Sequence, residues 1–132
     1  MMRRTIAVST LALAAALLTG AVIAANGLMG TYATKLTGVS AQFGGVWTIT
    51  FTAGGTYTIR HRGVVQGTGV ATIKPGSISF QDLTGKTKCT GAQAPNLYRY
   101  TLTDTTLRFI AVRDTCARKF VLTQHPWRKT GQ

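Results

Sequence analysis

The stretch VWTITFTAGGTYTI, residues 46–59, decides the fold class. Between Trp47 and Phe51, apolar residues alternate with threonine, which is the pattern of a half-buried strand. The loop AGG at 53–55 supplies glycine for a left-handed position, and its length pairs Phe51 with Tyr57 across a hairpin. The stretch therefore predicts two antiparallel strands whose bulky side chains lie on one face.

In two further hairpins, the length of the turn again places the large residues of both strands on one face. The KPGS turn at 74–77 places Ile73 opposite Ile78. A two-residue turn between the runs LYRYTLT and TLRFIAV pairs Tyr100 with Phe109. Because three independent hairpins place their large residues on a common side, we expect these strands to share one core.

Two segments complete the set of strands. The run ARKFVLTQ, residues 117–124, predicts the last strand, with Phe120 and Leu122 on one face, and TYATKL at 31–36 is either the remaining strand or coil. Successive hairpins without crossovers form a meander, and about eight strands close into a barrel without exposed edges. We predict an all-β, antiparallel up-and-down barrel, with a β-sandwich as the alternative.

The N-terminal residues 1–25 have the features of a secretory signal peptide. Arg3 and Arg4 precede an apolar run that ends in small residues, and cleavage after Ala24 is slightly preferred to cleavage one residue later. The alternative is an uncleaved anchor, because the apolar run is long enough to span a bilayer. We expect one domain, residues 26–132, in the extracellular or periplasmic space.

The charge of the chain is strongly positive. Loss of Arg3 and Arg4 from the 15 basic residues leaves 13 against three aspartates, a charge of +10 with no glutamate. Such a balance favours weak attraction to anionic cell-surface polymers. The basic residues are scattered singly, so we expect no specific nucleic-acid partner. We expect a monomer without a cofactor.

The two cysteines, Cys89 and Cys116, predict one disulfide in an exported chain. Closing the loop from Cys89 to Cys116 stabilises the folded state by roughly 3–3.5 kcal/mol in the chain-entropy model. A metal site is not predicted, because His61 and His125 lie far from both thiols in sequence and form no compact ligand spacing.

An enzyme is not predicted. General acid–base catalysis needs two titratable groups close together in a pocket. The acids are only Asp82, Asp104 and Asp114, all at expected strand ends or turns, where aspartate usually has a structural role.

The residues GVW at 45–47, with Arg118 at the start of the expected last strand, resemble the calycin pattern of lipocalins. The runs FQDLTGKTKC, LYRYTLTDTTLRF and RDTCARKFVL are similar to small secreted bacterial lipocalin-like domains of mostly unassigned activity. The resemblance covers roughly residues 43–128. It implies that a basic side chain covers Trp47 at the base of the barrel, Arg118 in preference to Arg113. We expect the domain to be shorter than a full lipocalin and to have no counterpart of the C-terminal helix of that family.

Within RDTCARKFVL, residues 113–122, we expect a structural latch. Asp114 can accept hydrogen bonds from backbone N–H groups of its own turn and pair with a neighbouring base. Cys116 would tie this corner to the loop at 83–96, and Arg118 can stack on an indole while donating to carbonyls.

Binding is the predicted class of function. Eight strands leave an interior that side chains fill or that holds one small ligand, and the sequence leaves both possibilities open. A pocket would suit a small amphipathic or anionic ligand, with candidate residues Trp47, Tyr57, Tyr98, Tyr100, Phe109 and Arg118. The alternative is a secreted protein-interaction or inhibitor-type barrel with a filled core, in which Asn26 to Phe43 would be a tail.

Overall fold

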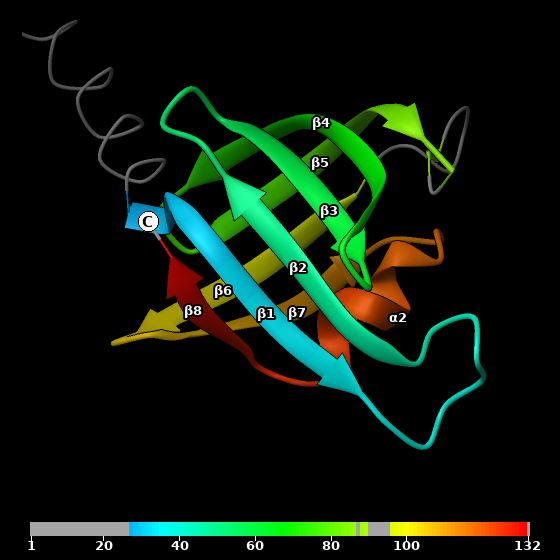
Figure 1. The fold of residues 1–132 in the computed structure, drawn as a ribbon. Helices are drawn as coiled ribbons and strands as arrows, with labels where there is room; N and C mark the ends of the chain where they lie inside the picture. The colour runs from blue at the N-terminus through cyan, green and yellow to red at the C-terminus, as the bar shows by residue number, and fades with distance from the viewer. Residues whose placement is uncertain (1–26, 87, 90–95, 132) are drawn as a thin grey trace, which may run out of the picture.

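The computed structural model is a closed barrel of eight antiparallel strands joined in chain order (Figure 1). It describes residues 27–86, 88–89 and 96–131, so the expected signal peptide lies outside the described residues. The strands are β1 (Gly30–Leu36), β2 (Gly45–Phe51), β3 (Thr56–His61), β4 (Val64–Lys74), β5 (Ser77–Gly85), β6 (Leu97–Thr103), β7 (Thr106–Arg113) and β8 (Trp127–Gly131). A short helix, α2 (Arg118–Thr123), lies between β7 and β8. The predicted up-and-down barrel is confirmed.

The registers of the three predicted hairpins are also confirmed. Phe51 pairs with Tyr57 across β2 and β3, and Ile73 pairs with Ile78 across β4 and β5. Tyr100 pairs with Phe109 across β6 and β7, whose two-residue turn holds Asp104 at a φ of 53°. Aspartate tolerates this left-handed conformation better than most residues, so the turn preserves the parity of the flanking strands.

One predicted element is wrong. The segment expected as the last strand contains the helix α2, and the chain reaches the barrel wall again only at β8. Val121 and Leu122 are adjacent in sequence and both buried. Adjacent residues of a strand point to opposite faces, so a strand with one exposed face cannot bury both, whereas a helix can bury both on one side. Pro126 then separates the helix from β8, since the residue before a proline is disfavoured in helical conformation.

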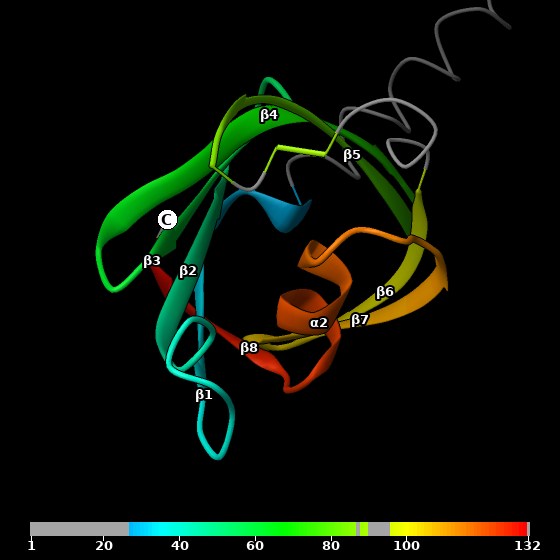
Figure 2. The same cartoon turned by 90° about the vertical axis from the view of Figure 1, so that its right-hand side faces the viewer.

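The helix α2 lies inside one end of the barrel. Figure 2 shows this end facing the viewer, with α2 within the ring of strands and close to β7. Phe120 packs on Phe43 at 5.0 Å between ring centroids, and Val121 and Leu122 are 3% and 2% exposed. The strands β7 and β8 pair only at Thr106 and Leu107, and α2 packs against β7. We call this the mouth end; the β4–β5 and β6–β7 turns lie at the far end.

Aromatic side chains fill the middle of the barrel. The ring of Phe80 contacts those of Tyr57, Tyr98 and Phe109 edge-on, with centroids 5.2, 5.7 and 6.1 Å away. Trp127 from β8 contacts Phe109 and is fully buried. Packed rings therefore fill the centre of the core, aliphatic side chains complete it, and one internal cavity among the described residues lies beside α2.

The structure also places β1 in the wall. Gly30–Leu36 pairs with β2 along its whole length and with β8 at its beginning. This confirms a strand at 31–36 and places the middle of the segment from Asn26 to Phe43, which the inhibitor-type alternative required as a free tail, in the barrel wall. No helix among the described residues is long and apolar enough to cross a membrane.

Candidate functional site

The guanidinium of Arg118 lies between two carboxylates at the mouth end. Its Nη1 is 2.8 Å from Asp82 Oδ2, and its Nε is 2.7 Å from Asp114 Oδ2. The three side chains are little exposed, at 8% for Arg118, 11% for Asp82 and 0% for Asp114. Buried charges are costly unless they are paired and hydrogen-bonded, and here each of the three charged groups has such a partner.

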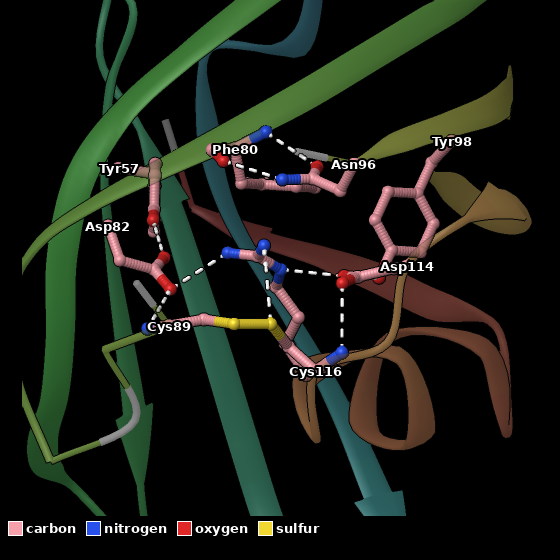
Figure 3. The surroundings of a disulfide bond; sticks show 9 residues. Tyr57, Phe80, Asp82, Cys89, Asn96, Tyr98, Asp114 and Cys116 are labelled. Carbon is pink, nitrogen blue, oxygen red and sulfur yellow. Dashed lines mark hydrogen bonds and ion pairs between the residues drawn. A yellow bond between two sulfur atoms is a disulfide. The ribbon is translucent and has the colours of Figure 1, made fainter. Parts of the chain in front are cut away.

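Each carboxylate is held by two further donors (Figure 3). Asp82 accepts from the Tyr57 hydroxyl and, at 3.0 Å, from the backbone N–H of Cys89. Asp114 accepts from the Tyr98 hydroxyl and, also at 3.0 Å, from the backbone N–H of Cys116. The two aspartates therefore have matching surroundings: one phenol, one cysteine N–H and a shared arginine.

The disulfide joins the two halves of this network. Cys89 and Cys116 are bonded with a Cα–Cα distance of 6.3 Å, as predicted from the cysteine count. The bond ties the connection after β5 to the residues that precede α2. The expected contacts of Asp114, to its own turn and to a neighbouring base, are confirmed as well.

Burial and hydrogen bonding keep the two phenols protonated. Burial, followed by the hydrogen bond to Asp82, raises the pKa of Tyr57 far above its ordinary value. Burial and the hydrogen bond to Asp114 do the same to the pKa of Tyr98. Desolvation acts to lower the pKa of Arg118, but its contacts with Asp114 and Asp82 outweigh that effect and raise it. The donors of this network are thus fixed at neutral pH.

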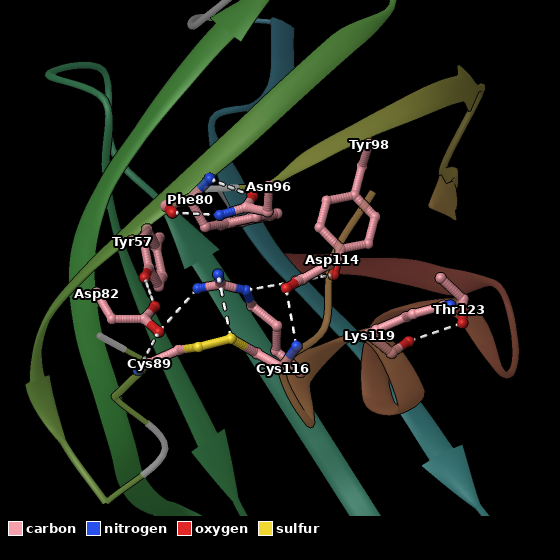
Figure 4. Close-up of polar contacts among 11 residues, drawn as sticks. Tyr57, Phe80, Asp82, Cys89, Asn96, Tyr98, Asp114, Cys116, Lys119 and Thr123 are labelled. Atoms are coloured by element: carbon pink, nitrogen blue, oxygen red, sulfur yellow. Dashed lines mark hydrogen bonds and ion pairs between the residues drawn. A yellow bond between two sulfur atoms is a disulfide. The ribbon is translucent and has the colours of Figure 1, made fainter. Parts of the chain in front are cut away.

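The helix α2 starts inside this network. Figure 4 shows the polar contacts from Asp82 across to α2, where the Thr123 hydroxyl donates to the Lys119 carbonyl at 2.7 Å. No side chain caps the N-terminus of α2 at Ala117, and the helix has only six residues. Such a short helix is not stable by itself, so its position depends on Arg118, the disulfide and its buried side chains.

Trp47 is stacked on a different partner from the one the lipocalin resemblance implies. The imidazole of His61, the strand partner of Trp47, lies parallel to the indole at 4.1 Å between centroids and 9° between planes. The indole N–H donates to the Phe43 carbonyl at 2.8 Å. Meanwhile the two carboxylates hold the guanidinium of Arg118, although Arg118 and Trp47 line the same cavity.

That inner cavity lies between α2 and the strands β2, β3 and β5. It has a volume of about 40 Å³, space for a few water molecules. Its walls are apolar except where Asp82 and Arg118 reach them. The lining residues are Phe43, Trp47, Ile49, Tyr57, Ile59, Phe80, Asp82, Ala117, Arg118, Val121 and Leu122.

A larger outer depression of about 500 Å³ opens at the mouth end. It shares Phe43, Trp47 and Ala117 with the inner cavity, so the two adjoin. Its remaining lining is polar and includes two lysines. The other lining residues are Gln42, His61, Gln66, Lys86, Lys88, Cys89, Thr115 and Cys116.

The structure brings together only some of the six candidate ligand residues. Trp47, Tyr57 and Arg118 line the inner cavity. Tyr98 is fully buried, and Tyr100 is partly buried against the core.

Phe109 lines a separate surface depression of about 210 Å³ beside the turn at 124–126. The outer depression, with Lys86 and Lys88, was not anticipated. Asp82 could have been found from the sequence, because it lies two residues after Phe80 on one strand and therefore faces the interior.

Comparison with known proteins finds no matching family model, no similar curated protein and no similar solved structure. The fold itself defines the class: a small up-and-down β-barrel of eight strands whose mouth end contains a helix. This architecture is consistent with a lipocalin-like fold, since lipocalins are eight-stranded barrels of this topology.

Proposed function

We propose that this protein is an exported, lipocalin-like binding barrel that takes one small amphipathic anion at its mouth end. The observation that carries the proposal is the continuity between an apolar inner cavity and an outer depression that contains Lys86 and Lys88. Ligand sites are typically concave and mostly apolar, with a few polar groups that fix orientation. The inner cavity would supply the apolar surface, and the outer depression would supply the polar groups.

The size of the inner cavity limits the ligand. About 40 Å³ admits only a short apolar group, so most of the ligand would lie in the outer depression. Short-chain fatty acids and small aromatic acids have suitable dimensions. A long acyl chain would require displacement of α2, because Val121 and Leu122 form part of the cavity wall.

The acid group of the ligand would meet lysine rather than Arg118. The guanidinium already has two carboxylate partners, and a third anion beside them would be repelled. Lys86 and Lys88 are exposed and lie on the rim of the outer depression. Weak attraction to anionic cell-surface polymers would follow from the same positive charge.

Calorimetric titration of the protein with hexanoate and phenylacetate, at low salt and in 1 M NaCl, tests the proposal. Apolar contacts survive high salt, whereas exposed charge pairs are screened within about 3 Å at 1 M. We expect a one-to-one complex that persists in high salt. Ala117 lines both the inner cavity and the outer depression, so the larger side chain of Ala117→Leu would block their junction. This variant should bind the acids about tenfold more weakly.

The control variant Thr101→Leu changes the unrelated depression beside His125 and should bind normally. Thermal melts establish that both variants are folded. Failure of every acid to bind, or binding that vanishes entirely at high salt, would refute the ligand site.

The runner-up function is a protein-interaction or inhibitor-type barrel with a filled core. The packed rings around Phe80 and the small inner cavity favour it. Its contacts would come from loops, since β1 belongs to the wall. Inhibition of a purified peptidase by the protein, unchanged by Ala117→Leu, would support this function over the first.

A further inference from the structure

The mouth end of the barrel combines exposed valines with exposed cations. The β3–β4 hairpin turns at Arg62 and Gly63, which both have positive φ, and projects Val64 and Val65 from the barrel. Val64 is 60% and Val65 48% exposed, and Val46 on the neighbouring β2 is 44% exposed. Exposed β-branched apolar side chains gathered at one end of the barrel indicate an interaction site.

Basic side chains surround these valines. Lys35 is the strand partner of Val46, and Arg60 is the partner of Val65. Further exposed cations lie on the turn, on the connection after β5, at the end of β7 and on α2; they are Arg62, Lys86, Lys88, Arg113 and Lys119. We call the surface formed by these cations and the three valines the docking face.

The acids of the described residues are absent from this face. Asp82 and Asp114 are buried and bound to Arg118. Asp104 lies in the β6–β7 turn at the far end. The described part of the barrel is positive on other faces as well, through Lys74, Arg99, Arg108, Arg128 and Lys129, but the docking face has more cations and no exposed acid.

We propose that the docking face binds the surface of an anionic phospholipid bilayer. Lys and Arg close to such a surface are attracted by its negative potential. Valine side chains at the hairpin tip can enter the boundary between headgroups and acyl chains, which a nucleic acid or an acidic peptide does not offer. The combination of apolar tip and cationic surround therefore favours a membrane over a soluble polyanion.

The geometry adds a consequence for the ligand site. His61 and Gln66 of the hairpin line the outer depression together with Lys86 and Lys88. Figure 2 shows the hairpin and α2 at the same end of the barrel. Docking would therefore turn the opening of the depression toward the lipid surface. The inference itself does not require a ligand.

Co-sedimentation with vesicles tests the inference. The full chain as expressed is mixed with vesicles of phosphatidylglycerol and phosphatidylcholine, or of phosphatidylcholine alone. All variants share the same N-terminal residues, so the comparison between variants isolates the docking face. We expect binding to the anionic vesicles that is at least tenfold stronger than binding to the neutral ones.

Two double variants separate the apolar and the charged contributions. Val64→Ser with Val65→Ser should weaken binding about tenfold, since two partly inserted side chains leave the lipid. Lys86→Gln with Lys88→Gln should weaken it about 25-fold, because each basic residue at an anionic surface contributes about fivefold.

Matched controls carry the same changes elsewhere. Ile110→Ser removes a side chain that is 62% exposed on the outer surface of β7. Lys74→Gln with Arg128→Gln removes two exposed charges outside the docking face. Both controls should bind within twofold of the parent, and melting temperatures should confirm that all variants are folded.

Three results would overturn the inference. The first is equal binding to neutral and anionic vesicles. The second is an equal loss from the lysine pair and from the control charge pair, which would mean diffuse attraction. The third is an unchanged affinity of the valine variant together with tighter binding of heparin or RNA, which would identify the face as a polyanion site.

Discussion

Replacing Arg118 by Ala should destabilise the protein severely. The guanidinium lies between the carboxylates of Asp82 and Asp114 and forms an ion pair with each. The exposed fractions of the three side chains are 8, 11 and 0%. Removing one partner of a buried ion pair typically costs about 3–5 kcal/mol, because an uncompensated charge remains. Here two carboxylates would lose their partner, so we expect the upper part of that range.

The loss would be large relative to the total stability. Domains of this size have unfolding free energies of about 5–15 kcal/mol, and each kcal/mol shifts the melting temperature by roughly 4–8 °C. We therefore expect Arg118→Ala to lower the melting temperature by at least about 15 °C. Urea unfolding monitored by circular dichroism provides the free energy, with Lys119→Ala as a control. Lys119 is exposed, and surface changes usually stay within about 0.5 kcal/mol.

A second variant makes the reasoning refutable. Arg118→Ala combined with Asp82→Asn and Asp114→Asn removes both stranded charges while keeping oxygens that accept from Tyr57 and Tyr98. It should recover a substantial part of the lost stability. A loss below about 1 kcal/mol in the single variant, or no recovery in the triple variant, would show that charge pairing is not what Arg118 contributes.

Three further predictions concern the disulfide, the phenols and the helix. Reduction of Cys89–Cys116 should lower the unfolding free energy by roughly 3–3.5 kcal/mol, and mass spectrometry of a non-reduced digest should find the linked peptides; two free thiols would contradict this. Because the folded-state pKa of Tyr57 is raised above 10.0, its stabilising contribution is complete below about pH 10 and is lost as the pH rises further. Stability should therefore fall above pH 10, and less steeply in Tyr57→Phe; identical alkaline profiles would refute this account. Leu122→Ala should cost about 2–5 kcal/mol and enlarge the inner cavity, whereas Leu83→Ala at a side chain 50% exposed should cost little, as thermal melts would show.

The hydrogen-bond network satisfies the two acids that are buried beside Arg118. Asp82 and Asp114 each accept from a phenol and a cysteine N–H, in addition to their ion pairs with Arg118. The disulfide brings the two cysteine N–H groups to opposite sides of the guanidinium (Figure 3). Covalent and ionic links therefore reinforce each other at the point where α2 enters the barrel.

The sequence determined the meander and its registers. Alternation of period two over Trp47 to Phe51, together with the lengths of the turns, is sufficient because a strand has only two faces and a slip of one residue would expose the core. It also determined the disulfide, since two cysteines allow one pairing.

Tertiary structure decided what fills the mouth end. The run from Arg118 to Thr123 fits both a short strand and a single helical turn, and a segment of six residues has too few repeats to distinguish the two periods. The helix forms because Val121 and Leu122 can both be buried inside the barrel and because Arg118 finds Asp82, which is 36 residues away in sequence. This long-range pairing depends on the closed barrel. Because the pairing positions α2, it also determines the size of the inner cavity.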